Sequence, residues 1–174
     1  VAGTALCDGG LTIDLSLMKG VLVNADAREA VVQPGATWGD VDRETQLYGL
    51  AVPSGIISNT GVPGLTLGGG FGWLSRKYGY TCDNLLEAEL VTAEGQVVRA
   101  NAEENADLFW GLRGGGGNFG VVTAFRFRLQ PARDAQYLDL GVEVESVAGL
   151  DLDGGDAFLE QRLESRPALA DEFL

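Results

Sequence analysis

The sequence has 174 residues, of which 45% are hydrophobic and 21% are charged, a composition that suits a globular domain with a core and excludes extended disorder. The net charge of −13 argues against nucleic acid as a partner, because a phosphate backbone is bound by a basic face, and no apolar run approaches the length of a membrane span. The absence of histidine removes the serine–histidine triad and the commonest metal ligand, so we predict no metal site.

The first fifty residues predict short strands followed by a helix. Strands are expected at residues 11–15, 21–23 and 30–32. Thr37, followed three residues later by Asp40, is typical of a helix N-terminus, and Gly49 is placed to end this helix.

Residues 51–72 follow neither a helical nor a strand period. Nine glycine and proline residues predict a loop, and ordered loops of this length usually have a function. Interleaved apolar residues such as Ile57, Leu67 and Phe71 favour burial, so we expect this loop to be ordered.

The second half predicts a hairpin, two further strands and two helices. The expected ranges are a hairpin of residues 88–92 and 96–99, a helix at 103–112, strands at 121–129 and 138–145, and a helix at 154–166. Alternation in the strand at 121–129 places Val121, Thr123 and Phe125 on one face. Residues 134–174 carry eleven acidic and two basic side chains, which indicates a domain boundary near Pro131.

Many of the 26 glycines gather in three clusters, at residues 61–72, 78–84 and 114–120. Glycine lets backbone amides approach a ligand closely, and successive amides form concave sites for anions such as a pyrophosphate. For any single cluster, the alternative is that glycine only permits tight packing. Gly115–Gly120 matches G-x-G-x-x-G, but a predicted helix precedes it and a strand follows, which is the wrong context for a Rossmann fold.

Several segments, in order along residues 1–131, carry a resemblance to a known family. They are Val1-Ala2-Gly3, Ala36–Val41, Thr60–Gly72, Ser75–Gly79, Cys82-Asp83-Asn84 and Phe109–Val122. The sequence resembles the flavin domain of the vanillyl-alcohol oxidase and p-cresol methylhydroxylase superfamily, in its berberine-bridge-enzyme-like branch. The resemblance implies an α+β fold of the FAD-binding PCMH type, with its second α+β subdomain in residues 1–131. Residues 132–174 would begin a substrate-binding domain.

The resemblance also implies flavin adenine dinucleotide (FAD) as the cofactor, lying extended between two subdomains. The residues expected to line it are Ser58, Thr60, Gly61, Gly64, Leu65, Gly68, Gly69, Gly70, Phe71, Gly72, Asn118, Gly120, Val121 and Val122. The first ten would follow the pyrophosphate, the ribityl chain and the ring, and backbone groups of Val121 and Val122 would meet the adenine.

The sequence departs from the family pattern at three places. The family often links its flavin to a histidine in an Arg-Gly-Gly-His loop just before the segment matching Val1, and we expect that preceding subdomain to be missing. The cysteine that makes a second link in some relatives aligns near Ile57, and Cys82 is predicted to be a buried structural residue. Leu65 stands where many relatives carry histidine.

The implied activity is that of an FAD-linked oxidase or dehydrogenase. It would transfer a hydride from an alcohol, sugar or amine-like carbon of a small-molecule substrate to the flavin, and then pass the electrons to oxygen. A nicotinamide-dependent reductase on the same fold and a flavin-free binding module remain as alternatives. We name no catalytic residue, because the substrate pocket would lie mainly in the following domain, and we expect the isolated chain to be inactive. Ten arginines against two lysines suggest a bacterial, cytoplasmic protein.

Overall fold

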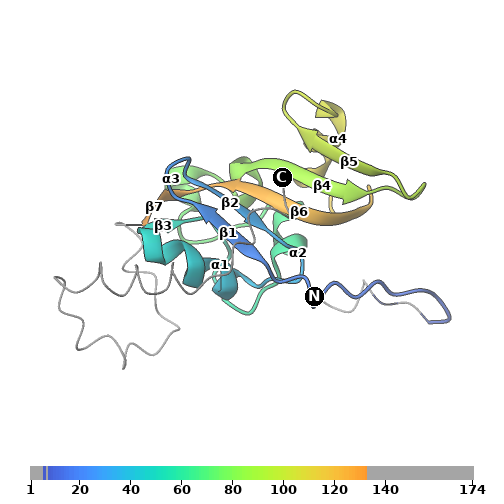
Figure 1. Cartoon of the computed structure of the whole chain (residues 1–174), viewed down its shortest axis with the longest axis horizontal. Coiled ribbons are helices and arrows are strands. Elements are labelled where there is room, and N and C mark those ends of the chain that lie inside the picture. The colour runs from blue at the N-terminus through green and yellow to red at the C-terminus, as the bar shows by residue number, and fades with distance from the viewer. Residues whose placement is uncertain (1–5, 7, 133–174) are drawn as a thin grey trace. The chain divides into compact units, whose positions relative to one another are not determined.

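The computed structural model describes residue 6 and residues 8–132, all within the unit Val1–Asp139. This part of the chain contains both strands and short helices (Figure 1). In chain order they are β1 (Val21–Asn24), β2 (Glu29–Val32), α1 (Trp38–Thr45), η1 (Gln46–Tyr48), β3 (Leu50–Ala51), α2 (Val62–Leu67), α3 (Ser75–Tyr78), η2 (Thr81–Asn84), β4 (Leu85–Val91), β5 (Val97–Asn101), α4 (Ala106–Leu112), β6 (Val121–Arg128) and β7 (Gln130–Pro131).

The main sheet has five strands in the order β1-β2-β6-β4-β5, and each neighbouring pair is antiparallel. β6 is the last strand of this sheet along the described chain, and it lies at the centre of the sheet (Figure 1). β3 and β7 form a separate antiparallel pair. The structure thus has the mixed α and β character that the resemblance implied, and its main sheet is antiparallel.

The core packs against one face of β6. Phe125 and Phe127 are fully buried, and their rings stack with centroids 5.9 Å apart. Trp38, at the start of α1, is also fully buried, and its ring centroid lies 5.6 Å from that of Phe127. The first turn of α1 is therefore attached to the centre of the sheet.

Most predicted elements are present, with shifted ends. Helix α1 begins after Thr37, as predicted, and η1 continues it until Gly49, whose left-handed φ of 63° ends the run. The strands at 21–23 and 30–32, the hairpin, the helix before Gly114 and the strand from Val121 are confirmed as β1, β2, β4–β5, α4 and β6.

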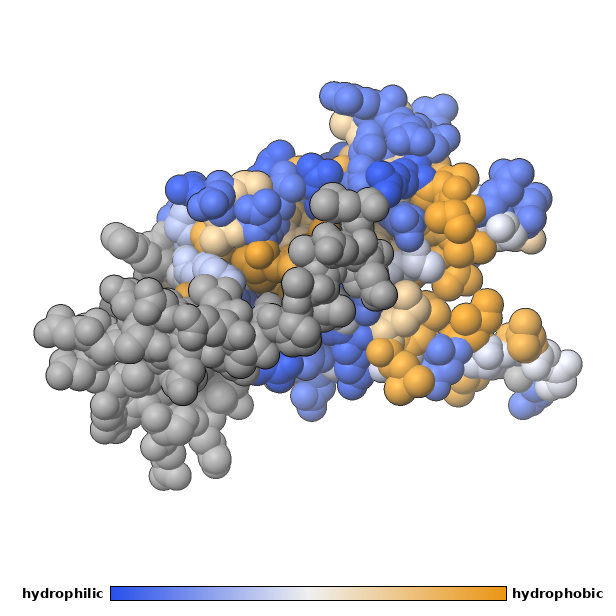
Figure 2. Space-filling model, viewed as in Figure 1, coloured by the Kyte–Doolittle hydropathy of each residue, from blue (hydrophilic) through white to orange (hydrophobic). Residues whose placement is uncertain are grey.

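The predicted strand at residues 11–15 is wrong, since this segment pairs with no strand among the described residues. The segment before β1 leaves large apolar side chains exposed, among them Leu11, Ile13 and Leu17. In Figure 2 it forms an apolar area at the lower right. An alternating pattern makes a strand only where another strand supplies hydrogen bonds.

The predicted alternation of residues 121–129 is wrong at its start. Val122 is 4% exposed and lies in the core, whereas Val121 and Thr123 are only half-buried. The pairing with β4 jumps from Val122 to Ala124, so Thr123 is an extra residue in a β-bulge. A bulge shifts the alternation by one residue, and a single sequence does not reveal it.

The loop at residues 51–72 contains one short helix, α2, that the sequence pattern did not predict. Its N-terminus carries proline and its interior carries Gly64, which weakens a helical pattern. The predicted strand at 138–145, the helix at 154–166 and the cysteine Cys7 lie outside the described residues. The domain boundary near Pro131 stays a prediction.

Candidate functional site

The structure brings the three glycine clusters together. The amide of Gly116, in the third cluster, donates to the carbonyl of Leu67 at 2.9 Å. The amides of Thr81 and Cys82, in the second cluster, donate to the carbonyls of Gly70 and Gly69 at 3.0 and 2.9 Å. Backbone groups of the first cluster therefore hold both of the others, and the clusters form one continuous surface.

Side chains strengthen the junction between the second and third clusters. Arg113 donates from Nε to the carbonyl of Cys82 at 3.0 Å, and its guanidinium lies 3.4 Å from the carboxylate of Asp83. Its guanidinium carbon also lies 5.4 Å from the centroid of the Phe109 ring. These contacts tie the loop after α4 to η2.

Asn84 holds the turn that supports Gly69 and Gly70. It is 2% exposed, and its side-chain amide donates to the carbonyls of Tyr78 and Tyr80 at 2.9 and 3.0 Å. Its own oxygen accepts from Gln130 at 2.9 Å. A buried amide satisfied on both sides is costly to replace, so Asn84 stabilises this turn.

Residues 58–62 are held by the first turn of α1. The amides of Trp38 and Gly39 donate to the carbonyls of Thr60 and Ser58 at 3.0 and 2.9 Å. In return, the amide of Val62 donates to the carbonyl of Ala36 at 3.1 Å. The free amides of the helix N-terminus are thereby satisfied by the loop.

Three glycines of this loop face open space, and of these Gly69 has a positive φ, of 102°, which by itself favours glycine. The other two are Gly61 and Gly64. A Cβ at Gly64 would meet nothing within 4 Å, and one at Gly61 would meet only Cδ of Pro63, at 4.0 Å. Neither has a positive φ. Packing and backbone geometry therefore do not require glycine here, whereas close approach of a ligand to the backbone would. These two positions therefore leave room for a ligand to approach the backbone closely.

Two other glycines of the loop are required by packing. A Cβ at Gly72 would collide with the carbonyl oxygen of Ser54, and one at Gly70 would collide with the hydroxyl of Thr81. Gly70 also has a φ of 79°. For these positions, the packing explanation holds.

The predicted site residues differ in exposure. Ser58, Gly61, Gly64, Gly68, Phe71 and Asn118 are exposed, Thr60, Leu65, Gly69, Gly70, Gly120 and Val121 are half-buried, and Gly72 and Val122 are buried. The side chain of Val122 points into the core, so only its backbone could meet a ligand.

β2 pairs with β6 only over Phe125–Arg128, which leaves the β2-facing edge of residues 121–124 without a partner among the described strands.

Large apolar side chains are exposed around the clusters. They are Ile56, Ile57, Phe71, Trp73, Tyr80, Trp110 and Phe119. Next to the third cluster, Trp110, Arg113 and Phe119 line a hollow of about 440 Å³. Such a concentration of exposed apolar surface is typical of a ligand site or an interface.

Cys82 is 6% exposed and is a free thiol. Burial raises the pKa of this thiol, and the nearby Asp83 carboxylate adds to the effect. A thiol held protonated is a poor nucleophile, in keeping with a structural role. The prediction that it does not link the flavin stays a prediction.

The sequence alone does not identify Trp38 and Asn84 as residues that support the site. Both belong to the motifs that carry the family resemblance, but the hydrogen bonds and packing of these residues join segments that are distant in sequence. Within residues 8–132, no three metal-binding side chains come together. No helix in the described part of the chain is long and apolar enough to cross a membrane.

Known proteins resemble this chain over most of its described length. The model of a family described as FAD binding domain matches residues 1–101. An FAD-linked oxidoreductase of Dictyostelium discoideum is 46% identical over 128 residues, which are 74% of this chain and 28% of that protein.

Solved structures of oxidases are also similar to this chain. The crystal structure of 6-hydroxy-D-nicotine oxidase from Arthrobacter nicotinovorans matches with a TM-score of 0.72 and 41% identity, over 74% of this chain and 28% of that one. A chitooligosaccharide oxidase matches with a TM-score of 0.67 and 38% identity, over 70% and 26%. The chain thus spans between a quarter and a third of the length of these relatives.

Proposed function

Since the chain belongs to the FAD-binding domain family, we propose that it forms one wall of the flavin site in an FAD-dependent oxidoreductase. The observation that carries the proposal is the joined surface of the three glycine clusters, with Gly61 and Gly64 open toward solvent. A wall of this kind can bind a pyrophosphate through backbone dipoles and amides without basic side chains. It therefore suits an anionic cofactor on a protein with a net charge of −13.

Different parts of the wall would meet different parts of the cofactor. Ser58, Thr60, Gly61 and Gly64 would lie along the pyrophosphate and ribityl chain. The residues expected to continue toward the ring and the adenine are Leu65, Gly68, Gly69, Gly70, Phe71, Gly72, Asn118, Gly120, Val121 and Val122. The edge of β6 at residues 121–124, unpaired on its β2 side among the described strands, supports backbone recognition of the adenine. For Gly72 and Val122, which are buried, the proposed contact is through the backbone.

When bound, the flavin supplies the hydride acceptor, and the protein supplies binding, orientation and exclusion of water. The exposed apolar residues Phe71 and Trp73 would help to exclude water beside the ring. We propose that the whole protein oxidises an alcohol, sugar or amine-like carbon of a small molecule, with oxygen as electron acceptor. Relatives named as oxidases of a hydroxynicotine and of a chitooligosaccharide support this range.

The proposal includes a cytoplasmic location in a bacterium, supported by the excess of arginine over lysine. It includes neither nucleic acid nor a membrane as a partner, since the chain is acidic.

The proposal is tested by titrating FAD into the purified chain and following flavin fluorescence and visible absorbance. We expect saturable binding with perturbed flavin bands. Absence of binding would contradict FAD binding by this chain on its own and favour a flavin-free module. Rapid bleaching of the bound flavin by NADPH, without any other reductant, would instead favour a nicotinamide-dependent reductase.

A further inference from the structure

The first turn of α1 holds residues 58–62 from one side. Three backbone hydrogen bonds of 2.9 to 3.1 Å join Ala36, Trp38 and Gly39 to this segment. Within it, Ser58 and Gly61 are exposed, and the preceding Ile57 is 62% exposed. Only Val62, at the end of the segment, is fully buried, so residues 58–61 depend largely on these hydrogen bonds for their order.

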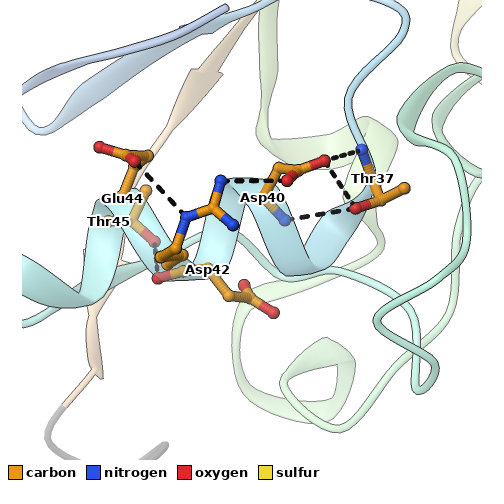
Figure 3. Close-up of polar contacts among 6 residues, drawn as sticks. Thr37, Asp40, Asp42, Glu44 and Thr45 are labelled. Atoms are coloured by element: carbon orange, nitrogen blue, oxygen red, sulfur yellow. Dashed lines mark hydrogen bonds and ion pairs between the residues drawn. The ribbon is translucent and has the colours of Figure 1, made fainter. Parts of the chain in front are cut away.

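The geometry of that turn is set by a capping box, shown in Figure 3. The amide of Asp40 donates to the hydroxyl of Thr37 at 3.3 Å. The amide and the hydroxyl of Thr37 donate to the Asp40 carboxylate at 3.0 and 2.8 Å. These reciprocal bonds fix the residues whose amides reach the loop.

The turn is in addition attached to the sheet. Trp38 is fully buried against Phe127, in the central strand β6. The Trp38 side chain has no free space in which to move, because it is fully buried. Any displacement within residues 37–40 therefore has to involve the cap residues Thr37 and Asp40. The cap thus lies between the rigid sheet and the exposed loop.

We propose that Thr37 and Asp40 are positioning residues, which hold Ser58–Val62 in the conformation that binds FAD. The inference rests on the proposed function. Neither side chain needs to touch the cofactor, since the effect passes through the amides of Trp38 and Gly39 to the carbonyls of Thr60 and Ser58. Loss of the cap would weaken FAD binding in addition to lowering the stability of the fold.

The test compares Thr37→Val, which removes the hydroxyl, with the conservative Thr37→Ser. The matched control is Asn101→Ala. The Asn101 side chain accepts from the amides of Glu103 and Glu104 at 2.9 and 2.8 Å and donates to the Glu87 carboxylate at 2.8 Å, so it stabilises a turn in a different part of the fold. Each variant of the full chain is measured for FAD affinity, for unfolding temperature, and for amide hydrogen exchange of residues 58–62.

We expect Thr37→Val to weaken FAD binding by about fivefold, the equivalent of one lost cap. Exchange at residues 58–62 should accelerate relative to β4 and β5, and Thr37→Ser should restore both properties. Asn101→Ala should lower the unfolding temperature by a similar amount and leave FAD affinity and exchange at 58–62 unchanged.

Equal FAD affinity in Thr37→Val and the wild type would overturn the positioning role, while the proposed function would stand. Equal losses of affinity in Thr37→Val and Asn101→Ala would also overturn it, by showing a general effect of stability. If the wild-type chain binds no FAD, FAD binding by this chain on its own fails, and unchanged exchange at 58–62 in Thr37→Val would still overturn the link between the cap and the loop.

Discussion

Glycines in the loop at residues 61–72 serve two physical purposes. Gly70 and Gly72 are required by neighbouring atoms of the protein, whereas Gly61 and Gly64 face open space. Glycine inside a helix costs up to about 1 kcal/mol relative to alanine. Packing does not explain the cost at Gly64, which lies inside α2, and the proposed FAD contact at that surface would explain it.

We predict that Gly64→Leu abolishes or weakens FAD binding by at least about tenfold, because its side chain would occupy the space assigned to the cofactor. The unfolding temperature should not fall, since a Cβ here meets nothing within 4 Å. Titration with FAD and thermal unfolding check the two parts. Ala93→Leu, which adds the same apolar bulk on the exposed β4–β5 turn, is the control; unchanged affinity in Gly64→Leu would remove Gly64 from the site.

Gly72→Ala, in contrast to Gly64→Leu, should lower the stability of the fold. Its Cβ would collide with the backbone oxygen of Ser54, which cannot move as a flexible side chain does. We expect a loss of about 1–3 kcal/mol in the free energy of unfolding, as for other overpacked positions. Urea unfolding measures it, with Gly64→Ala as the matched control; equal stability of the two variants would contradict this division of the glycines.

At the scale of the element, α1 is short but has several contacts that matter for the site. It spans Trp38–Thr45, and its capping box holds the turn whose amides reach the loop. The Thr37 amide, which donates to the Asp40 carboxylate, lowers the pKa of Asp40, and the Thr37 hydroxyl and Arg43 act in the same direction. The cap is therefore strongest when Asp40 is ionised.

This lowered pKa makes a prediction for the pH dependence of stability. A carboxyl whose pKa is lower in the folded state stabilises that state above its unfolded pKa of about 3.9. This contribution is lost as the pH falls through the folded pKa. Asp40→Asn should therefore be less stable than the wild type at pH 7, and the difference should vanish in strong acid. Urea unfolding between pH 7 and pH 2 measures it; a difference that persists undiminished at pH 2 would refute the assignment to ionised Asp40.

At the scale of the whole described unit, the site surface depends on the core of the sheet. Phe127 contacts Trp38 on one side and Phe125 on the other, so it connects β6 to the turn that holds the loop. β6 itself is the strand against which both β2 and β4 pair. Removal of the Phe127 ring should therefore destabilise the fold and the site surface together.

Phe127→Ala should destabilise the chain by about 3–5 kcal/mol, because a fully buried aromatic ring leaves a cavity behind. FAD affinity should fall with the population of folded chain. Thermal unfolding with and without FAD measures both, and Val97→Ala, at a position 66% exposed, is a control that should change little. A loss below about 1 kcal/mol would show that this ring is not central to the core.

The sequence alone determined the features that depend only on residues close together along the chain. The cap at Thr37 and Asp40, the end of the helix at Gly49 and the β4–β5 hairpin depend on residues within a few positions of one another. The motifs around the glycine clusters indicated the family and the cofactor, because they are specific combinations of residues.

Only the tertiary structure decided features that depend on partners distant in sequence. The strand predicted at residues 11–15 pairs with no described strand, and the extra residue at Thr123 is defined by its register with β4. The same holds for the glycines. Both Gly64 and Gly72 are glycines of one loop, and only the distance to Ser54 and the open space beside Gly64 show that packing requires glycine at position 72 but not at position 64.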